Sequence, residues 1–131
     1  MGIRFEKDTI LNWINEMGKF LRLLVDKWEH GIEEPNAPVD IAAGYKEFFQ
    51  KDRAYFQNMD DAGLGEFVAS LEPEQIRPLA QLLMYDGLFS NDRALLENSK
   101  FLFELHMRQS GSFAFEDYDF LAKIEQALKD F

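Results

Sequence analysis

Apolar residues recur at helical spacing over the first quarter of the chain. They fall at intervals of three and four positions, which predicts one long amphipathic helix over Thr9–His30. Asp8 is a good N-cap for this helix, and Gly31 stands where a left-handed residue commonly closes one. The residues predicted to face inward form one stripe: Ile10, Trp13, Ile14, Met17, Leu21, Leu24 and Trp28.

The apolar surface of this first helix is wider than its stripe. At about 100° per residue, Leu11 and Val25 lie on one side of the stripe, and Phe20 and Leu23 lie on the other, so the apolar arc covers roughly 240°. A single packing partner covers much less than this. The helix is therefore predicted to contact two neighbours within the fold, or one neighbour and another protein chain.

The flank formed by Phe20 and Leu23 is the candidate contact surface. Lys19 and Arg22 border these two residues and supply the polar rim that is typical of a protein interface. The predicted occupant is a protein partner or a second copy of the chain, with a symmetric homodimer as the commonest form of self-association.

Further helices are predicted after a connector at residues 31–38. One spans residues 39–58, and the pattern leaves open whether it breaks near Asp52 with that residue capping a new short helix. A short helix then carries Leu64, Phe67, Val68 and Leu71. The helix that follows starts at Pro73 or at Pro78, because proline is favoured in the first turn and disfavoured inside a helix.

Two more helices complete the predicted set. Gly87 is expected to end the proline-containing helix, and Ser90 or Asn91 is expected to cap the next, which stops at residues 110–112. The last helix covers Phe115–Asp130 with an acidic first turn. Its predicted inward residues are Tyr118, Leu121, Ile124, Ala127 and Leu128.

No segment alternates with the two-residue period of a strand, so no sheet is expected. Short connections between helices make neighbours antiparallel. The chain is therefore predicted to be all-α, a bundle or short stack of about three antiparallel helical hairpins, in a single domain over residues 1–131.

Charge narrows the range of partners. The chain of 131 residues has a formal net charge of −10 spread over both halves, and this disfavours nucleic-acid binding, whose affinity depends on clustered lysine and arginine. The richest apolar stretch, residues 20–25, is interrupted by Arg22 and is too short to span a membrane. We expect neither nucleic acid nor a membrane as a partner.

The residues that carry chemistry do not form a recognisable motif. There is no cysteine, and the two histidines lack a carboxylate at metal-binding spacing. Asp26 and Glu29 share one face in the way that helps bind magnesium in all-helical nucleotide hydrolases, but those enzymes need a second acidic pair on a facing helix and none is evident. No phosphate-binding glycine loop is present. We therefore expect no catalytic, cofactor or metal site, and a cytoplasmic location in keeping with the missing cysteine.

Two stretches carry a resemblance, and both are hydrophobic patterns. The first is Asp8-Thr9-Ile10-Leu11 followed by Ile14, Met17, Phe20 and Leu21, and the second is Leu71 and then Glu72 to Leu83 with Leu79-Ala80-Gln81-Leu82-Leu83. They resemble an uncharacterised bacterial family of unknown function, whose members look like tetratricopeptide-type helical hairpins. The full tetratricopeptide consensus is absent. The resemblance implies a fold and carries no site residues.

The leading functional hypothesis is a non-catalytic module for protein interaction or self-association. The alternative is an all-helical magnesium-dependent hydrolase or a ligand-binding regulator. Three or four carboxylates facing one cleft would favour the enzyme, and an apolar groove or a two-fold contact would favour the module.

Overall fold

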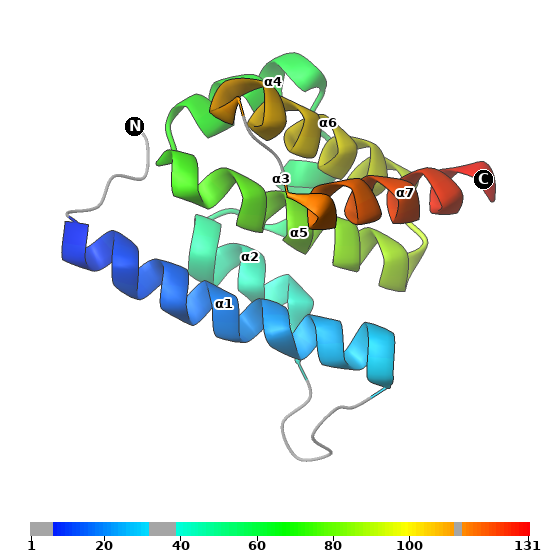
Figure 1. Cartoon of the computed structure of the whole chain (residues 1–131), viewed down its shortest axis with the longest axis horizontal. Coiled ribbons are helices and arrows are strands. Elements are labelled where there is room, and N and C mark those ends of the chain that lie inside the picture. The colour runs from blue at the N-terminus through cyan, green and yellow to red at the C-terminus, as the bar shows by residue number, and fades with distance from the viewer. Residues whose placement is uncertain (1–6, 32–38, 112–113) are drawn as a thin grey trace.

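The computed structural model describes residues 7–31, 39–111 and 114–131, and in these ranges the chain forms helices and no strand (Figure 1). The all-α prediction is therefore confirmed. The helices are α1 (Lys7–His30), α2 (Ile41–Phe49), α3 (Arg53–Gln57), α4 (Asp61–Ala69), α5 (Pro73–Ser90), α6 (Arg93–Ser110) and α7 (Phe115–Lys129).

Helix α5 lies at the centre of the bundle. It packs against α6 in an antiparallel hairpin, within which the Ser99 hydroxyl of α6 donates to the Ala80 carbonyl of α5 at 2.7 Å. Helices α1 and α7 also contact α5, while α3 and α4 pack on α6. Figure 1 shows α1 on one side of α5 and α6 on the other. The C-terminal ends of α1, α5 and α7 meet at one end of the molecule.

The segment at residues 39–58 forms two helices, so the break near Asp52 is the correct alternative. Gln50 adopts a left-handed conformation with φ 62° and closes α2. The Asp52 carboxylate then accepts a hydrogen bond from the Tyr55 backbone N–H at 2.9 Å and caps α3. A residue with a positive φ followed by an N-cap turns the chain between two short helices.

Helix α5 starts at Pro73, where the Gln75 side chain accepts a hydrogen bond from the Glu72 backbone N–H at 2.9 Å. Pro78 lies inside the helix. The prediction that Gly87 ends this helix is wrong, because α5 continues to Ser90. Gly87 is buried against α6, and a Cβ at this position would lie 2.8 Å from the Leu96 Cγ. The glycine therefore serves close helix packing.

The turn between α5 and α6 also differs from the prediction. Asn91, with φ 54°, closes α5, and Ser90 is the last residue of that helix. The N-cap of α6 is Asp92, whose carboxylate accepts from the Leu95 backbone N–H at 3.1 Å. Ser90, Asn91 and Asp92 are all good capping residues, so local preference could not select among them.

The core follows the predicted stripe of α1 over most of its length. Trp13 is buried, and its indole N–H donates to the Phe48 carbonyl of α2 at 3.0 Å. Trp28 was predicted to be core and this is wrong, because its side chain is 41% exposed. Its ring contacts Phe89 edge-on at 5.3 Å between centroids, and α5 ends one residue later, so the ring packs on the last turn of its neighbour.

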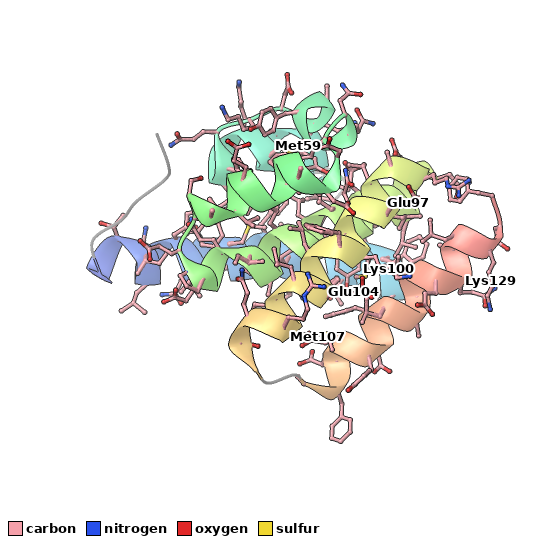
Figure 2. All side chains as sticks on the ribbon, turned by 90° about the horizontal axis from the view of Figure 1, so that it is seen from above. Met59, Glu97, Lys100, Glu104, Met107 and Lys129 are labelled. Carbon is pink, nitrogen blue, oxygen red and sulfur yellow. The ribbon has the colours of Figure 1, made fainter. Side chains whose placement is uncertain are left out.

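The inward face of α7 is rotated from the predicted one. Tyr118, predicted to face inward, is 48% exposed. Phe120 is buried instead and stacks on Phe103 of α6, with ring centroids 5.4 Å apart. Figure 2 shows Lys100 of α6 beside α7, and its ammonium lies 3.5 Å from the Glu125 carboxylate. These contacts fix the orientation of α7 on the α5–α6 hairpin.

Candidate functional site

The predicted contact flank of α1 is divided by the fold. As expected from the width of its apolar arc, α1 contacts two neighbours, α5 and α2. Phe20 is partly buried under α2, where its ring lies 5.5 Å from that of Phe48 and where a Cβ on Gly44 would lie 2.5 Å from a ring carbon. Leu23 remains 50% exposed. Phe20 therefore belongs to the packing of the fold, and Leu23 to its surface.

The other predicted residues of this flank stay together on the surface. Lys19, Arg22 and Leu23 line a shallow depression along the outer side of α1. Its remaining lining residues, Ile14, Asn15, Gly18 and Asp26, belong to the same helix. Because one helix supplies every wall, no second element positions a ligand there.

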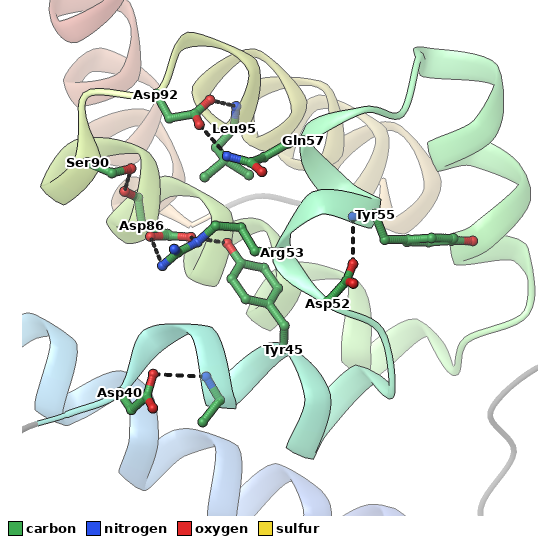
Figure 3. Close-up of polar contacts among 11 residues, drawn as sticks. Asp40, Tyr45, Asp52, Arg53, Tyr55, Gln57, Asp86, Ser90, Asp92 and Leu95 are labelled. Carbon is green, nitrogen blue, oxygen red and sulfur yellow. Dashed lines mark hydrogen bonds and ion pairs between the residues drawn. The ribbon is translucent and has the colours of Figure 1, made fainter.

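A buried polar cluster joins α2, α3 and α5 (Figure 3). The carboxylate of Asp86, 1% exposed, accepts a hydrogen bond from the Tyr45 hydroxyl at 2.6 Å. The Arg53 guanidinium binds the same carboxylate through two N–H groups, at 2.7 Å and 2.9 Å. A charged carboxylate inside a protein is stable only when it is paired and hydrogen-bonded, and this geometry supplies both conditions.

Protonation in this cluster is fixed at neutral pH. Burial, together with the negative charge of Asp86, raises the pKa of Tyr45 far above its ordinary value, so the hydroxyl keeps its proton. The hydrogen bond to Asp86 raises the pKa of Arg53, which stays charged. Both carboxylate oxygens are already occupied by these donors. The cluster therefore holds three helices together and has no group prepared for proton transfer.

The histidines and the acidic pair singled out by the sequence do not converge. His30 is exposed at the end of α1, and His106 is half-buried on α6. Asp26 lies in the α1 depression, whereas Glu29 forms an ion pair with Lys123 of α7 at 3.0 Å. Within the described ranges no group of three or more metal-ligating side chains is close enough to hold a metal ion.

A shallow hollow with apolar walls lies where the C-terminal ends of α1, α5 and α7 come together. We call it the terminal groove. Its volume is about 500 Å³, and three helices supply its walls. The apolar lining residues are Trp28, Leu88, Ala122 and Ala127, and the polar lining residues, which we call the rim, are Asn91, Lys123, Gln126 and Asp130.

The walls of the terminal groove are fixed by contacts outside it. Trp28 is held edge-on against Phe89, and the Lys27 ammonium lies 5.2 Å from the centre of the same ring. The ion pair between Lys123 and Glu29 ties α7 to α1 beside the opening. The groove is therefore formed by the folded chain before any partner arrives, as most binding pockets are.

Sequence reasoning missed the terminal groove for a physical reason. Trp28 falls on the inward stripe of α1, so periodicity assigned it to the core. Trp28 instead lines a hollow together with Ala122 and Ala127, whose small side chains leave space on α7. Two alanines five residues apart on the last helix are the local sign of it, and alanine is common in helices for other reasons.

No family model matches this chain, and neither a curated protein nor a solved structure does so. The resemblance to helical-hairpin proteins therefore stays a prediction. Among the described helices, none combines the length and the apolar character needed to cross a membrane.

Proposed function

We propose that this chain is a non-catalytic, cytoplasmic interaction module whose terminal groove binds a large apolar side chain of another protein chain. The observation that carries the proposal is the position of Trp28. Trp28 is 41% exposed and lines a hollow of about 500 Å³ between three helices. Interface residues that dominate affinity are enriched in tryptophan and sit beside such pockets.

The energetic gain from filling this groove is substantial for a single side chain. The exposed 41% of Trp28 amounts to on the order of 100 Å² of mainly apolar surface. Covering that area contributes roughly 2–3 kcal/mol. Leu88 and the two alanines add further apolar contact, and the polar rim matches the usual margin of a protein interface.

The chemistry of the groove favours a protein ligand over a small charged one. Lys123 and Asp130 are the charged residues among those that line the groove, and their charges cancel, so the lining has no net charge to attract a small ion. The buried acids Asp86 and Asp117 are each held by an arginine, at 2.7 Å in both cases, so they lend no support to a magnesium hydrolase. A pocket with apolar walls and a mixed polar rim suits an aliphatic or aromatic side chain on a helix or strand.

A peptide-display library tests this proposal directly. Selection against the intact protein should enrich peptides that share one large apolar residue. Ala122→Glu places a carboxylate in the groove and should weaken the enriched peptides by at least about tenfold, since a charge must then be desolvated.

Ala62→Glu is the matched control, because Ala62 is an exposed alanine on α4, which does not line the groove. Peptides that bind the Ala122→Glu protein as tightly as the wild type would show that another surface is used. Failure to enrich any peptide would also contradict the proposal.

A further inference from the structure

We infer that the occupant of the terminal groove is Phe115 from a second copy of this chain, with the two α7 helices antiparallel across a two-fold axis. This inference rests on the proposed function, and it names the partner. Phe115 is the first residue of α7 and is 90% exposed, which makes it the most exposed large apolar residue in the described ranges. Such a side chain is unfavourable in water unless another surface covers it.

Phe115 and the groove lie on one strip of the same helix. At about 100° per residue, Phe115, Ala122 and Gln126 point within roughly 40° of one another. Ala122 and Gln126 line the groove. The separation along the helix from Phe115 to Gln126 is about 17 Å at 1.5 Å per residue. One face of α7 therefore presents an exposed aromatic ring at its start and a recess at its end.

A two-fold axis across α7 brings these complementary features together twice. In an antiparallel pair, the start of each helix lies beside the end of the other. When Phe115 of one copy lies level with Ala127 of the second along the helix axis, beside Gln126 of the strip, Phe115 of the second copy lies level with Ala127 of the first. Such a contact is self-complementary and closes at two copies, so it does not propagate into a filament.

Opposite charges on α7 favour the register in which Phe115 lies level with Ala127 of the second copy. With Phe115 opposite Ala127, Asp119 stands opposite Lys123 of the second copy, four residues further along one helix and four back along the other. Symmetry repeats this pair. Asp119 is exposed, and Lys123 is 37% exposed with one hydrogen bond to Glu29, so its ammonium has donors for a second carboxylate. These cross pairs oppose the repulsion expected between two chains of net charge −10.

The test is the mass of the full chain by sedimentation equilibrium from micromolar to millimolar concentration. The wild type should form a dimer. Phe115→Asp should raise the dissociation constant by at least about tenfold, because it removes the ring from the groove and adds a charge. Leu11→Asp is the control, since Leu11 is 51% exposed on α1 and lies outside the groove. That variant should dimerise within about twofold of the wild type.

A charge exchange tests the register separately. Asp119→Lys and Lys123→Asp should each weaken the dimer by bringing like charges together, and the double variant should recover it. A wild type that stays monomeric, a Phe115→Asp protein that dimerises normally, or a double variant without recovery would each overturn this inference. If the chain is monomeric while selected peptides still bind the groove, the proposed function stands and only the second copy is excluded. If neither the peptides nor a second copy binds, both proposals fail.

Discussion

The cluster of Tyr45, Arg53 and Asp86 permits a quantitative test of how the fold is held together. Arg53→Met leaves the buried carboxylate with one hydrogen bond and no opposite charge. Removing one member of a buried ion pair costs about 3–5 kcal/mol. We expect a loss near the lower end of that range, about 3 kcal/mol, because the Arg53 side chain is 37% exposed and water replaces part of its interaction.

A second single change and the triple change test the other contacts of the cluster. Tyr45→Phe removes the 2.6 Å hydrogen bond to the carboxylate, which should cost about 1.5–3 kcal/mol. Replacing all three residues at once, with Phe, Met and Leu at positions 45, 53 and 86, should cost much less than the sum of the single losses. Apolar groups of similar volume then fill the site, and no buried polar group is left unpaired.

Urea unfolding followed by circular dichroism measures these free energies by linear extrapolation. The comparison needs Arg53→Met, Tyr45→Phe, a third single variant Asp86→Leu and the triple variant, with the slope of unfolding checked for constancy. If Arg53→Met costs less than about 1 kcal/mol, or if the three losses add without coupling, the cluster does not stabilise the fold as described.

Three further predictions concern stability. Trp13→Ala should lower the free energy of unfolding by about 3–5 kcal/mol, because the ring is buried and its indole N–H donates to the Phe48 carbonyl. A loss under about 1 kcal/mol in the same urea assay would show that Trp13 is not part of the core. Gly87→Ala should lower the thermal midpoint, since its Cβ would lie 2.8 Å from Leu96, and an unchanged or higher midpoint would show that α5 and α6 pack less closely. Burial and the charges of Glu29 and Glu116 raise the pKa of Tyr85 from 10.0 to about 12, so the folded chain keeps a proton that the unfolded chain releases. Stability should therefore fall between about pH 10 and pH 12, by at most about 1.4 kcal/mol per pH unit. Tyr85→Phe should make that fall shallower, and an identical pH profile would exclude the linkage.

Local sequence signals were sufficient for much of the helical framework. The long first helix follows from periodicity, although it begins at Lys7, before the predicted N-cap Asp8, and the stop at Gly111 follows from local capping preferences. The start of α5 stayed open between Pro73 and Pro78, and the structure places it at Pro73. The errors occur where a distant contact decides. Gly87 has the composition of a helix end but lies inside α5, because Leu96 of the next helix needs the space.

The candidate functional site was harder to predict from the sequence, because it also depends on contacts between residues far apart in the chain. Asp86 and Arg53 are 33 residues apart, and nothing local shows that their side chains meet. The flank of α1 was correctly identified as too wide for one partner, yet α2 covers Phe20 and leaves Leu23 exposed. The terminal groove needs three helix ends to meet, which only the tertiary packing shows.

The most direct test of the account is the indole N–H resonance of Trp28 in the intact protein, observed by nitrogen-15 NMR. On addition of a groove-selected peptide, and on raising the concentration of the chain itself, the Trp28 crosspeak should move because its exposed ring becomes covered. The Trp13 crosspeak should stay in place, because that indole is buried and bonded to Phe48. A Trp28 crosspeak that does not move under either condition would contradict the central claim that the terminal groove binds another protein chain.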